Sequence, residues 1–178
     1  MIHTTHTPSP IGDLLLAERD GKLIGLWIDG QKYYFGGLQD TVTEQETSIL
    51  TQAKTWLNRY FSGEKPSISE LRLAPVGSAF RQQVWQMLCQ IPYGTVLTYG
   101  DIARQMAVRM GKPQVSAQAV GGAVGHNPLS IIVPCHRVVG SNGSLTGYAA
   151  GIDTKRKLLA HEGVDVSRFT VPTKGTAL

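Results

Sequence analysis

The stretch Ile131-Ile132-Val133-Pro134-Cys135-His136-Arg137-Val138-Val139 sets the organisation of this 178-residue chain. Short blocks of β-branched residues on either side of a polar centre are typical of buried strands. Pro134 cannot donate a hydrogen bond to a strand ladder, so we expect the strand to break there. The sequence therefore predicts a cysteine at the point where a buried strand opens into a turn.

Cys135 has an imidazole and a guanidinium as its next neighbours in the sequence. A thiol near cationic groups tends to be held as the thiolate, which is the nucleophilic form. The alternative is an inert buried cysteine, because free cysteine is among the most buried residue types. The proline before Cys135 and the His136-Arg137 pair after it favour a nucleophile.

Length and composition are those of one ordinary globular domain or two small ones. No apolar run reaches membrane-spanning length, and the polar first ten residues lack the layout of a signal peptide. The chain has two cysteines, Cys89 and Cys135, and nothing suggests a disulfide framework. A reducing cytoplasm is therefore the expected location.

The charges are distributed unevenly along the chain. Residues 1–78 carry 7 Lys and Arg against 9 Asp and Glu, whereas residues 79–178 carry 10 against 4. Cys135 lies in this basic half, whose natural partner is a polyanion, with nucleic acid as the first candidate. Ordinary solvated charge is the alternative, because a surplus of this size is modest.

Residues 1–75 are expected to form a small N-terminal α/β module, an antiparallel sheet plus a helix, without catalytic residues. Two apolar runs, 11–17 and 23–28, flank Asp20-Gly21, which is a strong hairpin signal. An amphipathic helical pattern follows over residues 44–61. We expect the polar terminus before the hairpin to be frayed, with both of its histidines in solvent.

Residues 64–78 predict a linker, because prolines and glycines interrupt both periodic patterns. A mainly helical C-terminal domain is expected over residues 78–165, followed by a tail over residues 166–178. Together the two modules make an α+β protein.

Three residues of the C-terminal half are placed to cap helices. Ser78 precedes an apolar stripe, Thr98 with Asp101 is close to a capping box, and Ser116 precedes residues 117–124. Asp153 is expected to cap a last helix from Lys155 to Glu162.

The second and third of these helices, joined by a turn, suggest a helix-turn-helix. The third has few side chains with which to read bases, because Ala119, Gly121, Gly122 and Ala123 leave it nearly smooth. Such a helix could lie very close to a DNA groove. Tight internal packing explains the small residues equally well.

A nucleophilic Cys135 needs an activator, and the activator needs an orienting group. Neighbouring strand residues point to opposite faces, so contact with His136 requires the chain to leave strand geometry, or a bridging water. Glu162 lies at an apolar helix end beside Leu158 and Leu159. Taken alone, a solvated residue in a last turn explains Glu162 more simply.

Several motifs of the C-terminal half resemble the O6-alkylguanine-DNA alkyltransferase family. The resemblance rests on the Cys135 motif and on three further blocks, which are Asn127-Pro128, Thr146-Gly147-Tyr148-Ala149 and Leu158-Leu159-Ala160-His161-Glu162-Gly163. It covers roughly Ser78 to Gly163, with a looser likeness in the N-terminal module. Pro-Cys-His-Arg at this spacing from the other blocks is highly specific.

The resemblance implies a suicide repair protein that acts on double-stranded DNA carrying alkylated guanine. The thiolate would attack the alkyl carbon of a flipped guanine and keep the alkyl group as a thioether. O4-alkylthymine is a further possible substrate of this class. The resemblance implies a monomer that needs no cofactor, no metal and no membrane. Some members carry a zinc site in the N-terminal module, but this chain has no cysteines there.

The resemblance also implies roles for individual residues. Cys135 would be the acceptor, with His136 acting through water, Glu162 orienting His136 and Asn127 bracing the strand. The residues implied for the base pocket are Tyr99 and Tyr148, with the backbone of Val138 and Ala149. Those implied for DNA binding are Ser116, Gln118, Ala119, Gly122, Arg109 and Arg137.

Two features depart from the family pattern. Gln118 stands where the family commonly has an arginine that fills the space left by the flipped base. The segment between Tyr99 and Gln118 looks several residues longer than usual and carries Arg104, Arg109 and Lys112. Arg109 is therefore a second candidate for the space-filling role.

Two other classes of protein compete with this interpretation. A non-enzymatic DNA-binding module could sense damage through the helix-turn-helix, but alkyltransferase-like proteins of that kind lack the acceptor cysteine. A Cys-His-Glu hydrolase would need a nucleophile elbow or a glycine-framed cysteine, and neither is evident here. The number of products per protein separates the classes.

Overall fold

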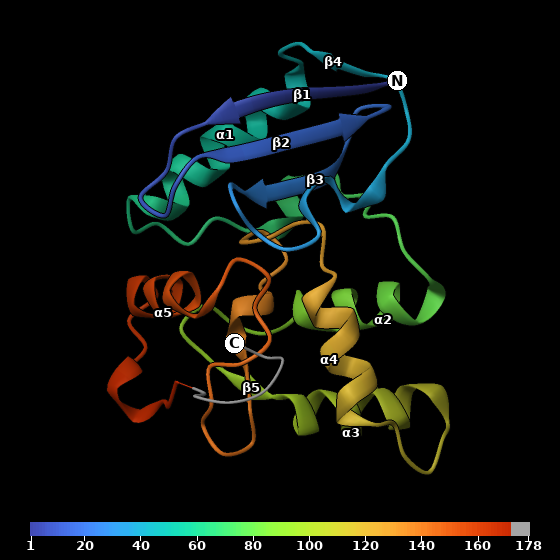
Figure 1. The fold of residues 1–178 in the computed structure, drawn as a ribbon, viewed down its shortest axis with the longest axis vertical. Coiled ribbons are helices and arrows are strands. Elements are labelled where there is room, and N and C mark those ends of the chain that lie inside the picture. Colours follow the sequence, from blue (N-terminus) through green and yellow to red (C-terminus); the bar gives the residue numbers. More distant parts are fainter. Residues whose placement is uncertain (172–178) are drawn as a thin grey trace. The chain divides into compact units, whose positions relative to one another are not determined.

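The computed structural model describes residues 1–171, which divide into two compact units (Figure 1). The first unit contains Met1–Val76 together with Pro128–Ile132. The second contains Gly77–Asn127 and the chain from Val133 onward. The expected α+β class is confirmed, with a sheet and one helix in the first unit and a mainly helical second unit.

The first unit is built on a four-stranded sheet of order β3-β2-β1-β4. Its strands are β1 (Ile2–Thr7), β2 (Leu14–Arg19), β3 (Lys22–Ile28) and β4 (Val42–Glu44). Strand β2 is antiparallel to both β1 and β3, and β4 runs parallel to β1. The predicted Asp20-Gly21 turn joins β2 to β3, and both of its residues have positive φ.

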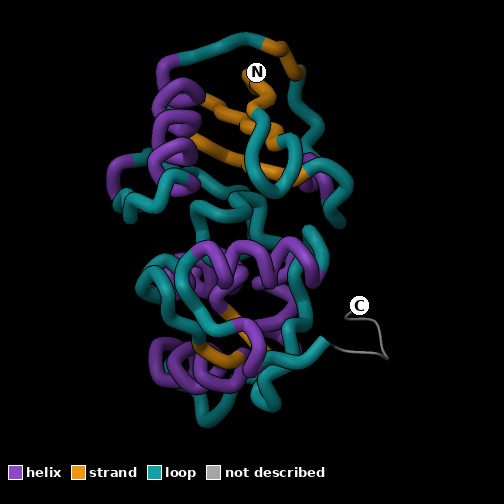
Figure 2. Tube along the Cα trace, turned by 90° about the vertical axis from the view of Figure 1, so that its left-hand side faces the viewer, coloured by secondary structure: helices purple, strands orange, loops and turns teal. Residues whose placement is uncertain are grey.

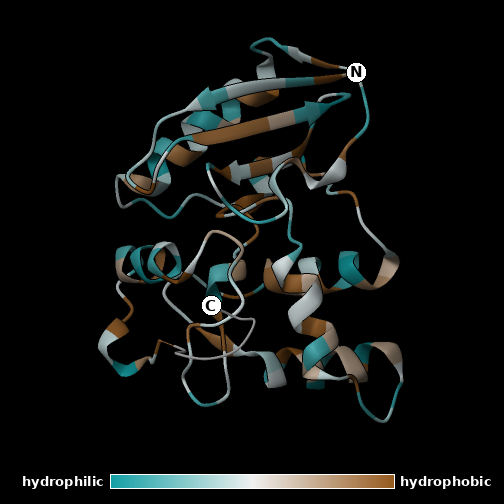
Figure 3. Cartoon of the chain, viewed as in Figure 1, coloured by the Kyte–Doolittle hydropathy of each residue, from teal (hydrophilic) through white to brown (hydrophobic). Residues whose placement is uncertain are grey.

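Both faces of the sheet are covered. Strand β2 is apolar over four consecutive residues and is brown in Figure 3, as expected for a strand buried on both sides. Helix α1 (Ser48–Phe61) lies along one face (Figures 1 and 2). On a face of the sheet, Leu15 and Ala17 join Trp27 in an apolar cluster against which Phe35 packs.

The outer edge of β3 is paired with two segments that are distant in sequence. Leu26 donates its N–H to the Pro128 carbonyl at 2.8 Å, and Ser130 N–H donates to the Leu26 carbonyl at 3.1 Å. Leu23 exchanges similar bonds with residues 72–74. Backbone groups of an otherwise open edge are thereby satisfied.

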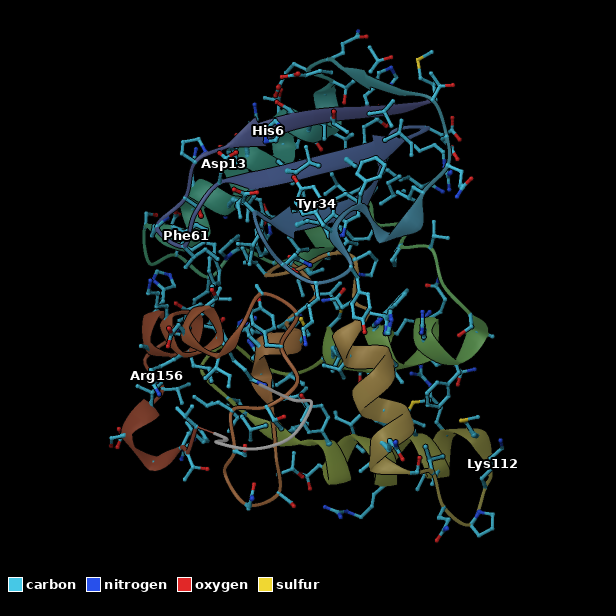
Figure 4. The ribbon with its side chains drawn as sticks, viewed as in Figure 1. His6, Asp13, Tyr34, Phe61, Lys112 and Arg156 are labelled. Atoms are coloured by element: carbon cyan, nitrogen blue, oxygen red, sulfur yellow. The ribbon has the colours of Figure 1, made fainter. Side chains whose placement is uncertain are left out.

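One prediction for the first unit was wrong. The N-terminus is not frayed, because β1 lies between β2 and β4. His6 is exposed, as expected, and is hydrogen-bonded to Asp13 at 3.0 Å, a pair that Figure 4 shows. His3 is half-buried and is hydrogen-bonded to Glu18 at 2.8 Å. Short polar strands in the middle of a sheet are held by ladder bonds that a hydropathy pattern does not reveal.

Residues 131–133 also do not form the strand predicted from their β-branched side chains. Ile131 has a φ of 71°, and Ile132 N–H donates to the Ser130 carbonyl at 2.8 Å. A β-branched residue in the left-handed region is a rare, strained conformation. The chain therefore turns sharply before Pro134 instead of extending toward it.

The second unit contains four α-helices and a two-stranded parallel sheet within the described residues. The helices are α2 (Ala79–Leu88), α3 (Tyr99–Met110), α4 (Ala117–Gly125) and α5 (Ile152–His161). Strand β5 (Leu97–Thr98) pairs with β6 (Val138–Val139). Helix α4 packs against both α2 and α3, which gives the expected helix-turn-helix.

Three of the predicted helix caps are confirmed. The Ser78 hydroxyl accepts from Arg81 N–H, the Ser116 hydroxyl accepts from Ala119 N–H, and Thr98 forms a reciprocal capping box with Asp101. The last helix differs from the prediction. It begins at Ile152 after Gly151, so Asp153 lies in its first turn and is not the cap.

The predicted tail is partly folded. Residues 166–168 form the 3-10 helix η4, and Thr170 forms a bridge with Ser144. Val166 and Phe169 pack against an apolar cluster that includes Leu145 and Leu159, which explains why this segment is ordered. The remaining part of the predicted tail, 172–178, lies outside the described residues. In residues 1–171, the helices are too short and polar to cross a membrane.

Candidate active site around Cys135

Cys135 lies in a tight 3-10 turn, η3 (Cys135–Arg137), directly before β6. The chain has already turned before Pro134, so the strand that was predicted to break at this proline does not form. Cys135 N–H donates to the Val133 carbonyl at 2.8 Å, and Arg137 N–H donates to the Pro134 carbonyl at 3.0 Å. This winding lets consecutive side chains point into one buried region, which a strand would not allow.

The thiol is buried, with 3% of Cys135 exposed. Asn127 Nδ2 donates to the Cys135 Sγ atom at 3.1 Å and to the Val133 carbonyl at 2.9 Å. One amide therefore fixes both the sulfur and the turn before it, which fits the bracing role expected of Asn127. Burial raises the pKa of Cys135, whereas the Asn127 hydrogen bond and the charge of Lys155 lower it.

His136 and Glu162 form a buried pair, with 2.6 Å between Nε2 and Oε2. Glu162 also accepts two hydrogen bonds from the Arg137 guanidinium, at 2.8 and 3.1 Å, and one from Gly94 N–H at 3.1 Å. Burial would raise the pKa of Glu162, but His136 and Arg137 together hold it far below its usual range. Glu162 is therefore an ionised carboxylate and not a solvated helix-end residue.

An ionised Glu162 fixes the protonation of the imidazole. Burial lowers the pKa of His136, so the ring is neutral near pH 7 even though Glu162 opposes the shift. The proton of a neutral ring then lies on Nε2, toward the carboxylate, and Nδ1 keeps a free lone pair. Nδ1 is buried and has no hydrogen-bond partner within residues 1–171. No direct bond joins it to the Cys135 thiol in that part of the chain.

The residues expected around the base lie on three elements of the second unit. Tyr99, the first residue of α3, donates its hydroxyl to the Thr146 carbonyl at 2.7 Å. Tyr148 is buried in the loop after β6, whereas Ala149 beside it is half-buried. The Val138 carbonyl accepts a hydrogen bond from Lys155 Nζ.

Gly147 has a structural reason to be glycine. Its φ is +84°, and a Cβ atom there would lie 2.3 Å from the Tyr99 hydroxyl. Only a glycine at position 147 therefore lets the Thr146-Gly147-Tyr148-Ala149 block lie this close to Tyr99.

The helix-turn-helix presents the expected small residues to solvent. Gln118, Ala119 and Gly122 are exposed on α4, whereas Val120 and Val124 are buried. Helix α4 is pale and brown over most of its length in Figure 3. A Cβ atom on Gly122 would meet nothing within 4 Å, so internal packing does not require this glycine.

The cations of the long α3–α4 segment are also exposed. Arg109 lies in the last turn of α3 and reaches the Gln83 carbonyl at 3.5 Å. Arg104 and Lys112 line a groove between α3 and the following loop, where Figure 4 labels Lys112.

One predicted DNA contact was wrong. Arg137 is 7% exposed, and its guanidinium donates to Glu162 and, at 2.7 Å, to the Ile91 carbonyl. A guanidinium with these partners is not available to a phosphate. It serves instead to keep Glu162 ionised.

Sequence reasoning missed Lys155, which is fully buried on α5. Its signal was present, because Lys155 lies three and four residues before the buried Leu158 and Leu159 on the same apolar stripe. A charged residue at such a position is unusual enough to mark a site. No cluster of potential metal ligands occurs within residues 1–171.

Comparisons with known proteins extend over both units. Residues 79–164 match the family model described as 6-O-methylguanine DNA methyltransferase, DNA binding domain, and residues 2–75 match its ribonuclease-like domain. A methylated-DNA–protein-cysteine methyltransferase of Haemophilus influenzae is 39% identical over 97% of this chain and 93% of its own. A protein of the same name from Mycobacterium tuberculosis is 43% identical over 91% and 93%.

The solved structures agree with the sequence matches. The crystal structure of Mycobacterium tuberculosis OGT in complex with DNA has a TM-score of 0.78 and 41% identity, and covers 94% of each chain. The crystal structure of Mycobacterium tuberculosis O6-methylguanine methyltransferase has a TM-score of 0.76 and covers 98% of this chain and 97% of the matched chain. The chain described here belongs to the 6-O-methylguanine DNA methyltransferase family.

Proposed function

We propose that this protein repairs double-stranded DNA by transferring the alkyl group of O6-alkylguanine to its own Cys135. The observation that carries the proposal is the buried Cys135 thiol, which is hydrogen-bonded to Asn127 and directly precedes the His136–Glu162 pair. Names of relatives from the same family agree with this activity.

The thiol must first lose its proton. The free lone pair on His136 Nδ1 is suited to receive it through a bridging water, and Glu162 stabilises the resulting imidazolium. The thiolate then attacks the alkyl carbon, so that the S–C bond forms and the C–O6 bond breaks. The electron pair of that bond stays on the guanine, which takes back the proton.

A reacting atom inside a duplex is out of reach of a buried thiol, so the base must be flipped out of the stack. In this proposal Tyr99, Tyr148 and the backbone of Val138 and Ala149 line the pocket that receives it. Helix α4 lies in the minor groove, where its exposed Ala119 and Gly122 allow close approach.

The remaining DNA contacts are assigned to the start of α4 and to the segment before it. Gln118 occupies the space that the base leaves, Ser116 lies at the helix start, and Arg109 contacts the phosphate backbone. The basic charge of residues 79–178 supplies the non-specific part of the affinity.

The product is a thioether, which has no easy hydrolytic exit. Each molecule therefore reacts once, without a cofactor. The acceptor must also remain a free thiol until it meets damage, which favours a reducing cytoplasm with the protein associated with DNA.

Mass spectrometry of the intact protein after incubation with duplex DNA containing O6-methylguanine tests the proposal. We expect one added methyl group per molecule, located on the Cys135 peptide. The Cys89→Ser variant is the matched control, because Cys89 is the other thiol and burial raises its pKa to about 11. Methylation that is lost in Cys89→Ser and kept in Cys135→Ala would overturn the assignment, as would many products per protein molecule.

A further inference from the structure

Lys155 is a buried cation that has no anionic partner within residues 1–171. Its Nζ atom donates to the Val138 carbonyl and, at 2.9 Å, to the Thr146 carbonyl. The ring centroid of Tyr99 lies 5.8 Å from it. Within residues 1–171 no ion pair includes Lys155, although lysine is rarely fully buried unless it is paired.

The charges of the buried cluster do not balance while Cys135 is a thiol. Arg137 and Glu162 cancel each other, and burial keeps His136 neutral. Lys155 then leaves the cluster with one positive charge in excess. An unbalanced charge in a buried region is costly, and an anion that arises beside it during function would remove the cost.

The Cys135 thiolate is that anion. The turn η3 that carries the sulfur leads directly into Val138, whose carbonyl Lys155 holds. Burial lowers the pKa of Lys155 to about 8, while the charge of Cys135 opposes that shift. The titratable or charged groups facing Lys155 are Cys135, Tyr99 and His136.

We propose that Lys155 is the counter-cation of the Cys135 thiolate and a positioning residue for the carbonyls of Val138 and Thr146. The second part rests on the proposed function, because the Val138 backbone is assigned to the base pocket and Thr146 lies two residues before Tyr148, which is also assigned to it. Lys155 keeps its proton throughout the transfer, in which the S–C bond forms as the C–O6 bond breaks. Since the thioether is neutral, the excess positive charge returns after the reaction.

The first experiment measures how fast iodoacetamide alkylates Cys135 as a function of pH, with the Cys135 peptide followed by mass spectrometry. The midpoint of this pH dependence reports the pKa of the Cys135 thiol. In Lys155→Met we expect that midpoint to rise by about one pH unit or more, which means about tenfold less thiolate near neutral pH. Lys155→Arg keeps the charge and should move the midpoint back toward that of the wild-type protein. Lys157→Met, two residues along the same helix and exposed, is the matched control.

A purely structural role for Lys155 would weaken base binding but leave this midpoint where it is. An unchanged midpoint in Lys155→Met therefore overturns the proposal. If that variant does not fold, the titration of Lys155 itself decides the question. It is measured by NMR on protein labelled with carbon-13 at its lysines. Coupling between two sites is reciprocal, so the Lys155 midpoint should fall in Cys135→Ser.

If the titration midpoint of Lys155 is the same in the wild-type protein and in Cys135→Ser, the pairing of Lys155 with the Cys135 thiolate is rejected. Neither measurement requires DNA. Failure of the proposed function would instead appear as an absent methyl group on Cys135 after incubation with methylated duplex, so the two failures are distinguishable.

Discussion

Replacing Glu162 by Gln removes the negative charge on which the buried cluster depends while leaving its shape almost unchanged. The carboxylate accepts hydrogen bonds from His136, Arg137 and Gly94. A Gln amide has one acceptor oxygen and one donor nitrogen, so it cannot satisfy all of these donors. If the amide nitrogen faces His136, the imidazole must accept at Nε2 and carry its proton on Nδ1.

This change of tautomer removes the base that we assign to the thiol. Loss of a positioned acid–base group costs on the order of 10²–10⁴-fold in rate. The Arg137 guanidinium is left buried without its counter-charge, and breaking a buried pair in this way costs about 3–5 kcal/mol of stability. We expect the lower end for Gln, because its oxygen still accepts from one donor.

The loss of stability should depend on pH. The pKa of Glu162 in the folded state is lower than the value of about 4.3 in the unfolded chain, so the folded protein binds fewer protons. The stabilisation is present above that unfolded value and is lost as the pH falls toward the folded pKa. The difference in unfolding free energy between the wild-type protein and Glu162→Gln should therefore shrink on acidification below about pH 4.

Single-turnover transfer from methylated duplex across pH, with urea unfolding at the same pH values, measures both effects. Asp153→Asn is the matched control, because Asp153 is an exposed carboxylate on the same helix. An unchanged rate and pH profile in Glu162→Gln would refute the role of Glu162. So would a stability difference between the two proteins that stays constant from neutral to acidic pH.

Cys135→Ala should abolish methyl transfer but leave DNA affinity within about twofold, since binding rests on groove and phosphate contacts; a large loss in a gel-shift assay would contradict this. Gln118→Arg should speed repair of duplex but not of free O6-methylguanine base, which needs no flipping, and should change the log–log salt slope of binding by roughly −0.9. Unchanged duplex repair in Gln118→Arg, with severe loss in Arg109→Ala, would transfer the space-filling role to Arg109. Gly147→Ala should destabilise the protein by about 1–3 kcal/mol, because the position has positive φ and the new Cβ would collide with the Tyr99 hydroxyl; an unchanged urea midpoint would count against the close approach.

The residues to which we assign chemistry could be picked out from the sequence because they lie in short, distinctive motifs. Cys135, His136 and Asn127 occupy such motifs, and the helix caps at Ser78, Thr98 and Ser116 follow from local hydrogen bonding. The role of Arg137 could not be predicted in the same way. Its partner Glu162 lies 25 residues further along the chain, so nothing local distinguishes this arginine from one that binds phosphate.

The failures in the fold also come from long-range contacts. Strand β1 is too polar for a hydropathy pattern, and it is ordered by its pairing with β2 and β4. Residues 131–133 have the composition of a strand, but pairing of the preceding residues with Leu26 makes the chain turn. Lys155 was expected only as the first residue of the last helix, and its burial comes from packing that the local sequence does not show.

The pairing of residues 128–132 with β3 has a consequence for dissecting this protein. These five residues connect Asn127 to Val133, the two residues whose side chain and carbonyl hold the turn before Cys135. A fragment cut at the linker would keep every side chain of the buried cluster around Cys135. It would nevertheless strip Pro128 and Ser130 of their backbone partners on Leu26. Strand β3 of the N-terminal module thus acts as a template for the length of chain that leads toward Cys135.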